Sequence, residues 1–401
     1  MDKIKVKKGY HMLSDRIQTL SESLTMAITA LAQQLKREGK DILGFSAGEP
    51  DFDTPQVIKD AAIRAINEGF TKYTPVDGIP ELKEAIVEKL RRDNGLSYAT
   101  DQVIASNGAK QSLFNLFQAT INPGDEVIIP APYWVTYPEL VKYSGGVPVV
   151  IETDDSSGFK ITPQQLKDAI TQKSRMLILT SPSNPTGAVY TREELEAIAE
   201  TLKGTDILVA SDEMYEKLVY DGATFTAAAS VSEDMYNRTV TINGLSKSVA
   251  MTGWRFGYCA AADRDLVKAM KKLQSQSTSN INSITQIASI KGLDGSADED
   301  IEMMRRAFES RCGEAARLFN EIEGLSVIKP DGAFYLFVNH KEVEPDSMKF
   351  AKALLERAGV AVVPGAGFGS DGYFRFSFAT DIDTIRTGIE RIGNFVRSYR
   401  E

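Results

Sequence analysis

The chain has 401 residues, enough for two or three cores, and its 42% apolar and 25% charged residues are those of an ordinary globular protein. Its net charge of -9 argues against nucleic acid as the main partner, because phosphate backbones attract basic surfaces. With only His11 and His340, and two cysteines in no paired spacing, the sequence argues against a Ser–His–Asp hydrolase, a bound metal or a disulfide framework.

The start of the chain differs in charge from the rest. Lysines cluster ahead of Met12, and we expect residues 1–12 to form a solvated, disordered tail. The start lacks the apolar core of a signal peptide, and no apolar run approaches the roughly 20 residues that cross a bilayer. We therefore expect a cytoplasmic protein without a membrane partner.

From residue 101 to about residue 262, short β-branched runs alternate with helical stretches. Two capping boxes, at Thr162 with Gln165 and at Thr191 with Glu194, mark helix starts. This alternation predicts an α/β fold, in which helices cover a mostly parallel sheet that binds ligands beyond the carboxyl ends of its strands. The predicted strands are Glu126–Pro130, Val147–Glu152, Arg175–Thr180, Asp206–Ser211 and Thr239–Ile242.

Beyond Gly292 the pattern changes to a long charged helix followed by mixed strands and helices. The predicted elements are helices at Asp298–Glu321, Met348–Arg357 and Asp381–Arg400, and strands at Gly332–Asn339, Val360–Val363 and Tyr373–Phe378. We expect a large α/β domain at residues 51–291 and a smaller α+β domain at residues 292–401, which residues 13–50 complete.

Lys247 follows a predicted central strand, and Arg255 comes shortly after it. A lysine amine forms a Schiff base with an aldehyde once burial or nearby positive charge lowers its pKa. An adjacent arginine can bind the phosphate of that aldehyde through paired hydrogen bonds. The alternative is a solvated surface lysine, which is the common environment of this residue type.

Two more candidates follow predicted strands. A buried carboxylate at Asp212 needs a partner, such as the protonated nitrogen of a pyridine ring. Tyr215 can donate to the phenolic oxygen of such a ring, and Asn184, in the rigid loop Ser181–Gly187, offers both a donor and an acceptor. The alternatives are a helix cap for Asp212 and a plain loop around Asn184.

Small residues open the helix that runs on through Phe117. Backbone N–H groups at such a start can approach an anion, which the helix dipole also favours, and the residues concerned are Gly108, Ala109 and Lys110. Trp134 follows another predicted strand and can stack on an aromatic ring, with a core position as the alternative.

The stretch Tyr373–Phe378 alternates with period two, so that Arg375 and Ser377 face away from the phenylalanines. If that face is buried, Arg375 needs an anionic partner, and the α-carboxylate of a substrate fits its fork. A structural salt bridge is the alternative.

Taken together, these motifs resemble the class I/II aminotransferases of fold type I, in family order and from about Leu13 to the end of the chain. The matching segments are Gly44–Pro55, Ser181–Gly187, Ser211–Tyr215, Ser246-Lys247 and Met251–Arg255. The sequence most resembles the prokaryotic aspartate aminotransferase subgroup, subgroup Ib. The resemblance implies a seven-stranded sheet in the large domain, pyridoxal 5′-phosphate as cofactor, and a homodimer with shared active sites.

The resemblance also implies roles for the residues that match. Lys247 matches the Schiff-base lysine that moves the substrate's α-proton, Asp212 the partner of the pyridine nitrogen, and Trp134 the stacking aromatic. Tyr215 and Asn184 match the pair at the phenolic oxygen. The phosphate is assigned to Gly108, Ala109, Lys110, Ser246 and Arg255, and to Tyr73 of the neighbouring subunit.

Substrate contacts follow from the same resemblance, with Arg375 matching the α-carboxylate arginine. The residues that match substrate contacts are Gly48, Trp134, Asn184, Arg375, Lys110 and Thr25. Lys110, together with Ser23 and Thr25, suits a distal carboxylate and so favours a dicarboxylate amino donor. One position departs from the pattern, because Gly244 stands where many relatives carry a phosphate-binding serine.

We therefore expect ping-pong transfer of the amino group from L-aspartate to 2-oxoglutarate. An aromatic amino acid or prephenate aminotransferase, and a pyridoxal-phosphate-dependent lyase or decarboxylase, are the alternatives on the same fold, because fold does not fix specificity. The sensor domain of a transcription regulator is a further alternative. It is disfavoured because such proteins carry a DNA-binding helical domain ahead of this fold.

Overall fold

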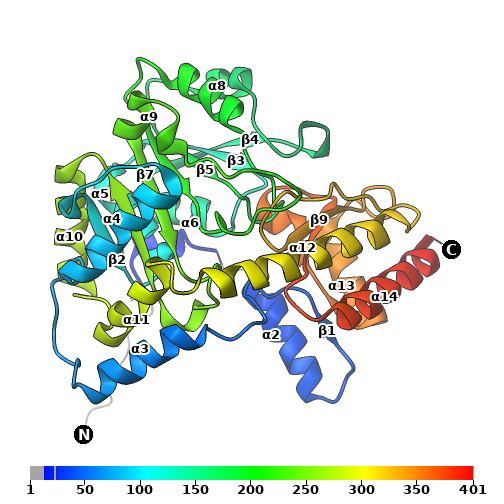
Figure 1. The fold of residues 1–401 in the computed structure, drawn as a ribbon. Coiled ribbons are helices and arrows are strands. Elements are labelled where there is room, and N and C mark those ends of the chain that lie inside the picture. Colours follow the sequence, from blue (N-terminus) through cyan, green and yellow to red (C-terminus); the bar gives the residue numbers. More distant parts are fainter. Residues whose placement is uncertain (1–12, 22–23, 401) are drawn as a thin grey trace, which may run out of the picture.

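The computed structural model describes residues 13–21 and 24–400. A mixed sheet of seven strands forms the middle of the larger part of the molecule (Figure 1). In space the strands follow the order β2-β8-β7-β6-β5-β3-β4. The strand β8 runs antiparallel to β2 and β7, and the other neighbours are parallel. The strands are β2 (Val103–Ser106), β3 (Glu126–Ala131), β4 (Val147–Glu152), β5 (Ser174–Thr180), β6 (Leu208–Asp212), β7 (Thr239–Gly244) and β8 (Gly257–Ala261). The predicted strands are confirmed, with ends that differ by at most two residues.

Helices cover both faces of this sheet. Alternate residues of a strand point to opposite faces, so Val127 and Ile129 of β3 pack with α5, α6 and α10, while Ile128 packs with α8. Both predicted capping boxes are present, at Thr162 and Thr191. The helices of this part are α3 (Gln56–Asn67), α4 (Pro80–Asn94), α5 (Ala109–Thr120), α6 (Thr136–Tyr143), α7 (Pro163–Ala169), α8 (Arg192–Leu202), α9 (Glu233–Arg238), α10 (Arg264–Ser277) and α11 (Ser283–Leu293).

Three parallel strands end where candidate residues begin. Asn184 follows β5, Asp212 is the last residue of β6, and Lys247 follows β7. Because parallel strands bring their carboxyl ends to one edge of a sheet, residues far apart in sequence meet there.

The second part of the chain builds a smaller three-stranded antiparallel sheet in the order β11-β12-β9. Figure 1 shows α12 running from the side of α11 toward this sheet. The predicted strand Val360–Val363 is divided, because β10 pairs with β1 and β11 pairs with β12. The elements are α12 (Asp298–Asn320), β9 (Tyr335–Asn339), α13 (Ser347–Ala358), β10 (Val360–Ala361), β11 (Val363–Pro364), β12 (Tyr373–Ser377) and α14 (Ile382–Arg400).

From α2 onward the N-terminal segment packs against this smaller part, while Arg16 of α1 contacts Tyr143 of α6 in the larger part. Its elements are α1 (Asp15–Gln18), α2 (Leu24–Arg37) and β1 (Leu43–Gly44), and β1 pairs in parallel with β10. The ring of Phe45 stacks on Phe376 with centroids 4.1 Å apart. A Cβ at Gly388 of α14 would lie 2.2 Å from the Phe45 ring, so glycine makes this close approach possible. The pairing agrees with the predicted completion of the small domain, whose boundaries stay a prediction, and the predicted tail at residues 1–12 lies outside the described residues.

None of the helices in the described part of the chain is both long and apolar enough to cross a membrane.

We predict that Phe376→Ala lowers the free energy of unfolding by about 3–5 kcal/mol, because it leaves a cavity between Phe45 and Phe319. Urea denaturation followed by tryptophan fluorescence and by circular dichroism measures the change. Met303→Ala, at a half-exposed position of α12, is the matched control and is expected within about 0.5 kcal/mol of the parent. Equal stability of the two variants would show that Phe45 does not fasten the N-terminal segment to the smaller sheet.

Candidate active site

A cavity of 550 Å³ lies at the carboxyl edge of the large sheet, where β9 and β12 of the smaller part face it. It brings together most of the residues that the sequence singles out. Those lining it are Gly48, Ala109, Lys110, Trp134, Asn184, Asp212, Tyr215, Ser246, Lys247, Arg255 and Arg375. Residues from five strand ends and from the N-terminal segment therefore meet in one place, as the strand-end argument predicts.

Lys247 is a partly buried lysine with a lowered pKa. Its Nζ donates a hydrogen bond to the backbone oxygen of Gly48. Burial lowers the pKa of Lys247 to about 8, and the positive charges of Arg375 and Arg255 act in the same direction. About a tenth of the amine is therefore uncharged at pH 7, far more than for an ordinary lysine, and a nucleophile or proton carrier requires this form.

Asp212 is a buried carboxylate without a cationic hydrogen-bond partner among the described residues. Tyr137 donates to its Oδ2 at 2.6 Å, and the backbone N–H of Met214 lies 3.3 Å from its Oδ1. Burial raises the pKa of Asp212, while the hydrogen bond from Tyr137 works against that rise. A positively charged donor in the cavity would stabilise the ionised carboxylate. The helix cap is not its main role, since Met214 belongs to no helix.

Arg375 is a buried cation whose donors are only partly used. It is 3% exposed, and its two terminal nitrogens donate to Asn184 Oδ1 at 2.9 Å and to the backbone oxygen of Ser46 at 2.8 Å. Its Nε has no partner in the described chain, and no acidic side chain there forms an ion pair with it. The alternative of a structural salt bridge is therefore not what the structure contains, and burial lowers the pKa of the guanidinium.

The start of α5 forms a cradle with Arg255. Gly108, the residue before the helix, has a φ of +81° and supplies no side-chain cap to the first turn. A Cβ there would lie 2.5 Å from the Arg255 guanidinium, so glycine lets the arginine cross the helix start. A Cβ at Gly257 would lie 2.2 Å from the backbone nitrogen of Ala109. Helix dipole and arginine thus converge on one spot that suits an anion.

Lys110 and Trp134 border the same cavity. The Nζ of Lys110 lies 4.8 Å from the centroid of a Trp134 ring, at cation–π distance. Burial lowers the pKa of Lys110, and the nearby charge of Arg255 adds to this. Trp134 is only partly buried, so its ring is available to the cavity rather than enclosed in a core.

The departure at Gly244 has a steric reason. Gly244 ends β7, and a Cβ at this position would lie 2.8 Å from the backbone oxygen of Phe256 and 3.0 Å from the Cα of Gly257. A serine would require β7 and β8 to move apart. The donors left for an anion here are the hydroxyl of Ser246, the Arg255 side chain and backbone N–H groups.

Some predicted residues lie elsewhere. Tyr73 is 92% exposed and does not line the cavity of its own chain. Thr25 falls on α2, and Ser23 lies outside the described residues.

Two tyrosines of the site were missed. Tyr137 lies one helical turn after Trp134 and contacts Asp212, and Tyr335 hydrogen bonds to Tyr215 with a hydroxyl distance of 2.8 Å. The only signal for Tyr335 was its place in the predicted strand Gly332–Asn339, and no local motif marks it. Tyr137 lies in the first turn of α6, and its sequence context does not distinguish it from a tyrosine of the core.

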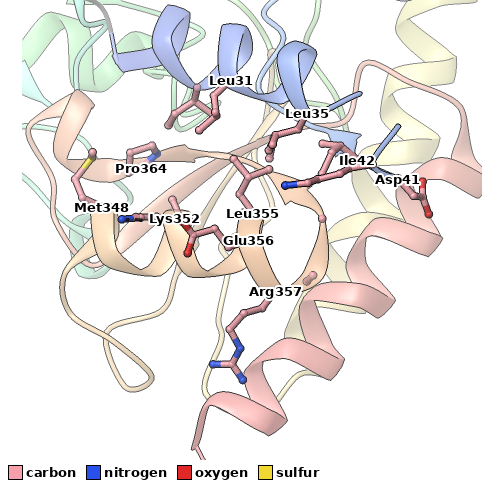
Figure 2. A pocket seen from close by; sticks show the side chains of 16 residues that line it. Leu31, Leu35, Asp41, Ile42, Met348, Lys352, Leu355, Glu356, Arg357 and Pro364 are labelled. Atoms are coloured by element: carbon pink, nitrogen blue, oxygen red, sulfur yellow. Dashed lines mark ion pairs between the residues drawn. The ribbon is translucent and has the colours of Figure 1, made fainter. Parts of the chain in front are cut away.

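A second cavity, of 660 Å³, opens between α2 and α13 (Figure 2). Its walls are mostly apolar, with Leu31 and Leu35 on one side and Met348 and Leu355 on the other. It is the larger of the two cavities, yet it contains none of the predicted site residues. Chemistry belongs to the smaller cavity, because that is where buried groups with shifted pKa values converge.

Comparisons with known proteins agree with this site. A profile of the family described as aminotransferase class I and II matches residues 40–392. The aspartate aminotransferase of Bacillus sp. (strain YM-2) is 50% identical over 391 residues, 96% of this chain and 99% of that protein. The aspartate/prephenate aminotransferase of Nitrosomonas europaea is 46% identical over 396 residues, again 96% of this chain and 99% of its own length.

Solved structures show the same fold. The structure of Thermus thermophilus aspartate aminotransferase with maleate is similar to this chain with a TM-score of 0.92 and 43% identity, covering 96% of this chain and 100% of the other. The predicted family resemblance and the predicted fold type are thereby confirmed.

We predict that the amine of Lys247 reacts with an acylating reagent with a midpoint near pH 8 in the cofactor-free protein. An ordinary lysine has a midpoint of about 10.4. Mass spectrometry of labelled peptides over a pH series measures it, with exposed Lys352 as internal reference for the reagent. Arg375→Gln removes one of the positive charges that lower this pKa, so it is expected to move the midpoint upward. A midpoint for Lys247 near that of an ordinary lysine would contradict the burial argument.

Proposed function

The chain belongs to the class I and II aminotransferases, and we propose that it transfers the amino group of L-aspartate to 2-oxoglutarate with pyridoxal 5′-phosphate as cofactor. The observation that carries this proposal is the convergence in one cavity of a partly buried amine with a lowered pKa, Lys247, and a buried arginine, Arg375, that forms no ion pair within the described part of the chain. The first is the group that condenses with an aldehyde, and the second fits the carboxylate that every amino acid carries.

The residues present fit the cofactor at three points. The uncapped start of α5 offers backbone N–H donors to its phosphate, and Arg255 adds a positive charge. Asp212, which has no cationic hydrogen-bond partner in the part of the chain that the structure describes, suits a protonated ring nitrogen. Trp134 offers an aromatic face beside Lys110. When bound, pyridoxal phosphate supplies an aldehyde that condenses with amines and a ring that accepts electrons from the substrate's α-carbon.

The chain's own groups divide the remaining work. Lys247 Nζ would take the proton from the substrate's α-carbon and deliver it to C4′, the aldehyde carbon of the cofactor, since its pKa of about 8 allows both forms near neutral pH. Asp212 holds the proton on the ring nitrogen, and its negative charge keeps that proton in place. Asn184 and Tyr215 direct donors toward the phenolic oxygen, with Asn184 oriented by the hydrogen bond that its Oδ1 accepts from Arg375.

The substrate is bound by its carboxylates. Arg375 binds the α-carboxylate, with Gly48 as a backbone contact near Lys247. Lys110 supplies a second positive charge in the cavity, which suits the distal carboxylate of aspartate. The family resemblance assigns Thr25 to the same carboxylate, and that role stays a prediction. The Thermus thermophilus relative was solved with maleate, itself a dicarboxylate, which supports this choice of substrate.

An aromatic or prephenate substrate is the second candidate. The Nitrosomonas europaea relative is an aspartate/prephenate aminotransferase, so the same scaffold serves an acceptor with a ring. A cavity of 550 Å³ with Trp134 and Lys110 on its wall has room for such a molecule.

We predict that the purified enzyme loses the visible band of the aldehyde form of its cofactor on addition of L-aspartate alone, and regains it with 2-oxoglutarate. Absorption spectra measure both half-reactions. Lys247→Ala is expected to lower kcat by about 10⁴-fold, because it removes the proton carrier, while Lys268→Ala at an exposed position leaves kcat unchanged. A bound cofactor that ignores aspartate but responds to phenylalanine would favour the second candidate.

We also propose a homodimer in which Tyr73 of one subunit completes the phosphate site of the other. Its 92% exposure in the single chain supports this, since the side chain is left almost wholly accessible to a second subunit. Ile63 and Ile66 on α3 are also about half exposed, as apolar side chains at an interface between subunits would be.

The dimer is tested by mixing two defective subunits. Tyr73→Ala and Lys247→Ala chains carrying different tags are coexpressed, and the hybrid is isolated by tandem affinity. If Tyr73 acts across the interface, one of the two sites of the hybrid is intact, and about half of the wild-type activity returns. A hybrid no more active than its Tyr73→Ala parent would refute the shared site, and a fully active monomer in sedimentation would refute the dimer.

A further inference from the structure

Tyr335 lines the cavity, and none of the roles described above uses this side chain. It is fully buried on β9, next to β12, which carries Arg375. In the antiparallel register Tyr335 pairs with Ser377 and Phe337 pairs with Arg375, so Tyr335 and Arg375 share one face of the sheet as diagonal neighbours.

Tyr335 contacts both ends of the site. The guanidinium carbon of Arg375 lies 4.4 Å from the centroid of its ring, within cation–π distance. Its hydroxyl lies 2.8 Å from the hydroxyl of Tyr215. The same hydroxyl would lie 3.1 Å from a Cβ at Gly48, so the Tyr335 side chain reaches from β9 to the N-terminal segment. Among the described residues, Tyr335 is therefore the side chain that links Arg375 to Tyr215.

Two hydroxyls that share one hydrogen bond must divide two protons. Each phenol has one O–H donor, so Tyr215 can direct its proton into the cavity only if Tyr335 donates to the Tyr215 oxygen. Burial raises the pKa of both phenols, and the positive charge of Arg375 over the Tyr335 ring works against that rise at Tyr335, which makes Tyr335 the better donor of the two. Hydrogen bonds in such a chain strengthen one another.

We propose that Tyr335 is a positioning residue that couples the carboxylate-binding Arg375 to Tyr215, by donating to Tyr215 so that the proton of Tyr215 points at the phenolic oxygen of the cofactor. A carboxylate bound at Arg375 offsets the charge over the Tyr335 ring and weakens this donation. Binding of a carboxylate at Arg375 thereby weakens the hydrogen bond that Tyr215 donates to the phenolic oxygen. This inference rests on the proposed function, because it needs the cofactor and its substrate carboxylate in this cavity.

The coupling is measured by titrating the visible band of the holoenzyme with pH, with and without succinate, an unreactive dicarboxylate. Tyr335→Phe keeps the ring over Arg375 and removes only the hydroxyl. The apparent pKa of the band is expected to rise by about 0.5–1 pH unit, the size of one lost hydrogen bond of ordinary strength. The further shift that succinate causes in the wild type is expected to shrink in this variant.

Two more variants separate coupling from a structural effect. In Tyr215→Phe the acceptor of the Tyr335 proton is absent, so adding Tyr335→Phe is expected to change the band no further. Tyr335→Leu also removes the ring, and is expected to raise the KM for aspartate, which Tyr335→Phe leaves nearly unchanged. An unshifted band in Tyr335→Phe, or additive shifts in the double variant, would overturn the coupling. A wild-type band that ignores aspartate would instead discard the proposed function, so the two failures are distinguishable.

Discussion

Two cations that form no ion pair with the described chain constrain the whole active site. Arg375 is buried and Lys247 is partly buried, and the carboxylates of Glu49 and Asp212 act on Lys247 only at longer range. Removing a charge from water is costly unless a partner compensates it. The cavity therefore favours anionic molecules, and the lowered pKa of Lys247 shows how the protein relieves part of the cost by shedding a proton. The fold has to hold these charges rigidly against that cost.

The two sheets supply this rigidity. The large sheet brings Asn184, Asp212 and Lys247 to one edge, because their strands run parallel. The smaller sheet holds Arg375 on β12, whose opposite face carries Phe374 and Phe376 into an apolar core. The segment after β1 lies beside both, where the backbone oxygens of Ser46 and Gly48 accept hydrogen bonds from the two cations. Each charged group thus projects from a regular element or from the turn directly after one.

Local sequence predicts the parts of this site that have local causes. The period-two run around Arg375 identified both its strand and its inward face, and strand ends marked Asp212 and Lys247. Gly244 could be recognised as a departure, but its cause, the approach of the Phe256 carbonyl from β8, requires the pairing of two strands. Tyr335 and Tyr137 act through contacts 120 and 75 residues away in sequence, so no motif contains them. The larger cavity between α2 and α13 likewise depends on packing alone.

Arg375 is proposed to bind the carboxylate of the substrate. Calorimetric titration of the holoenzyme with succinate tests this assignment most directly. Wild type is expected to bind succinate, and Arg375→Gln, which keeps the shape and hydrogen-bonding ability of the side chain without its charge, is expected to bind it about 10–100-fold more weakly, the worth of a charge-assisted pair. Equal affinity in both proteins would contradict the assignment of Arg375 as the carboxylate site.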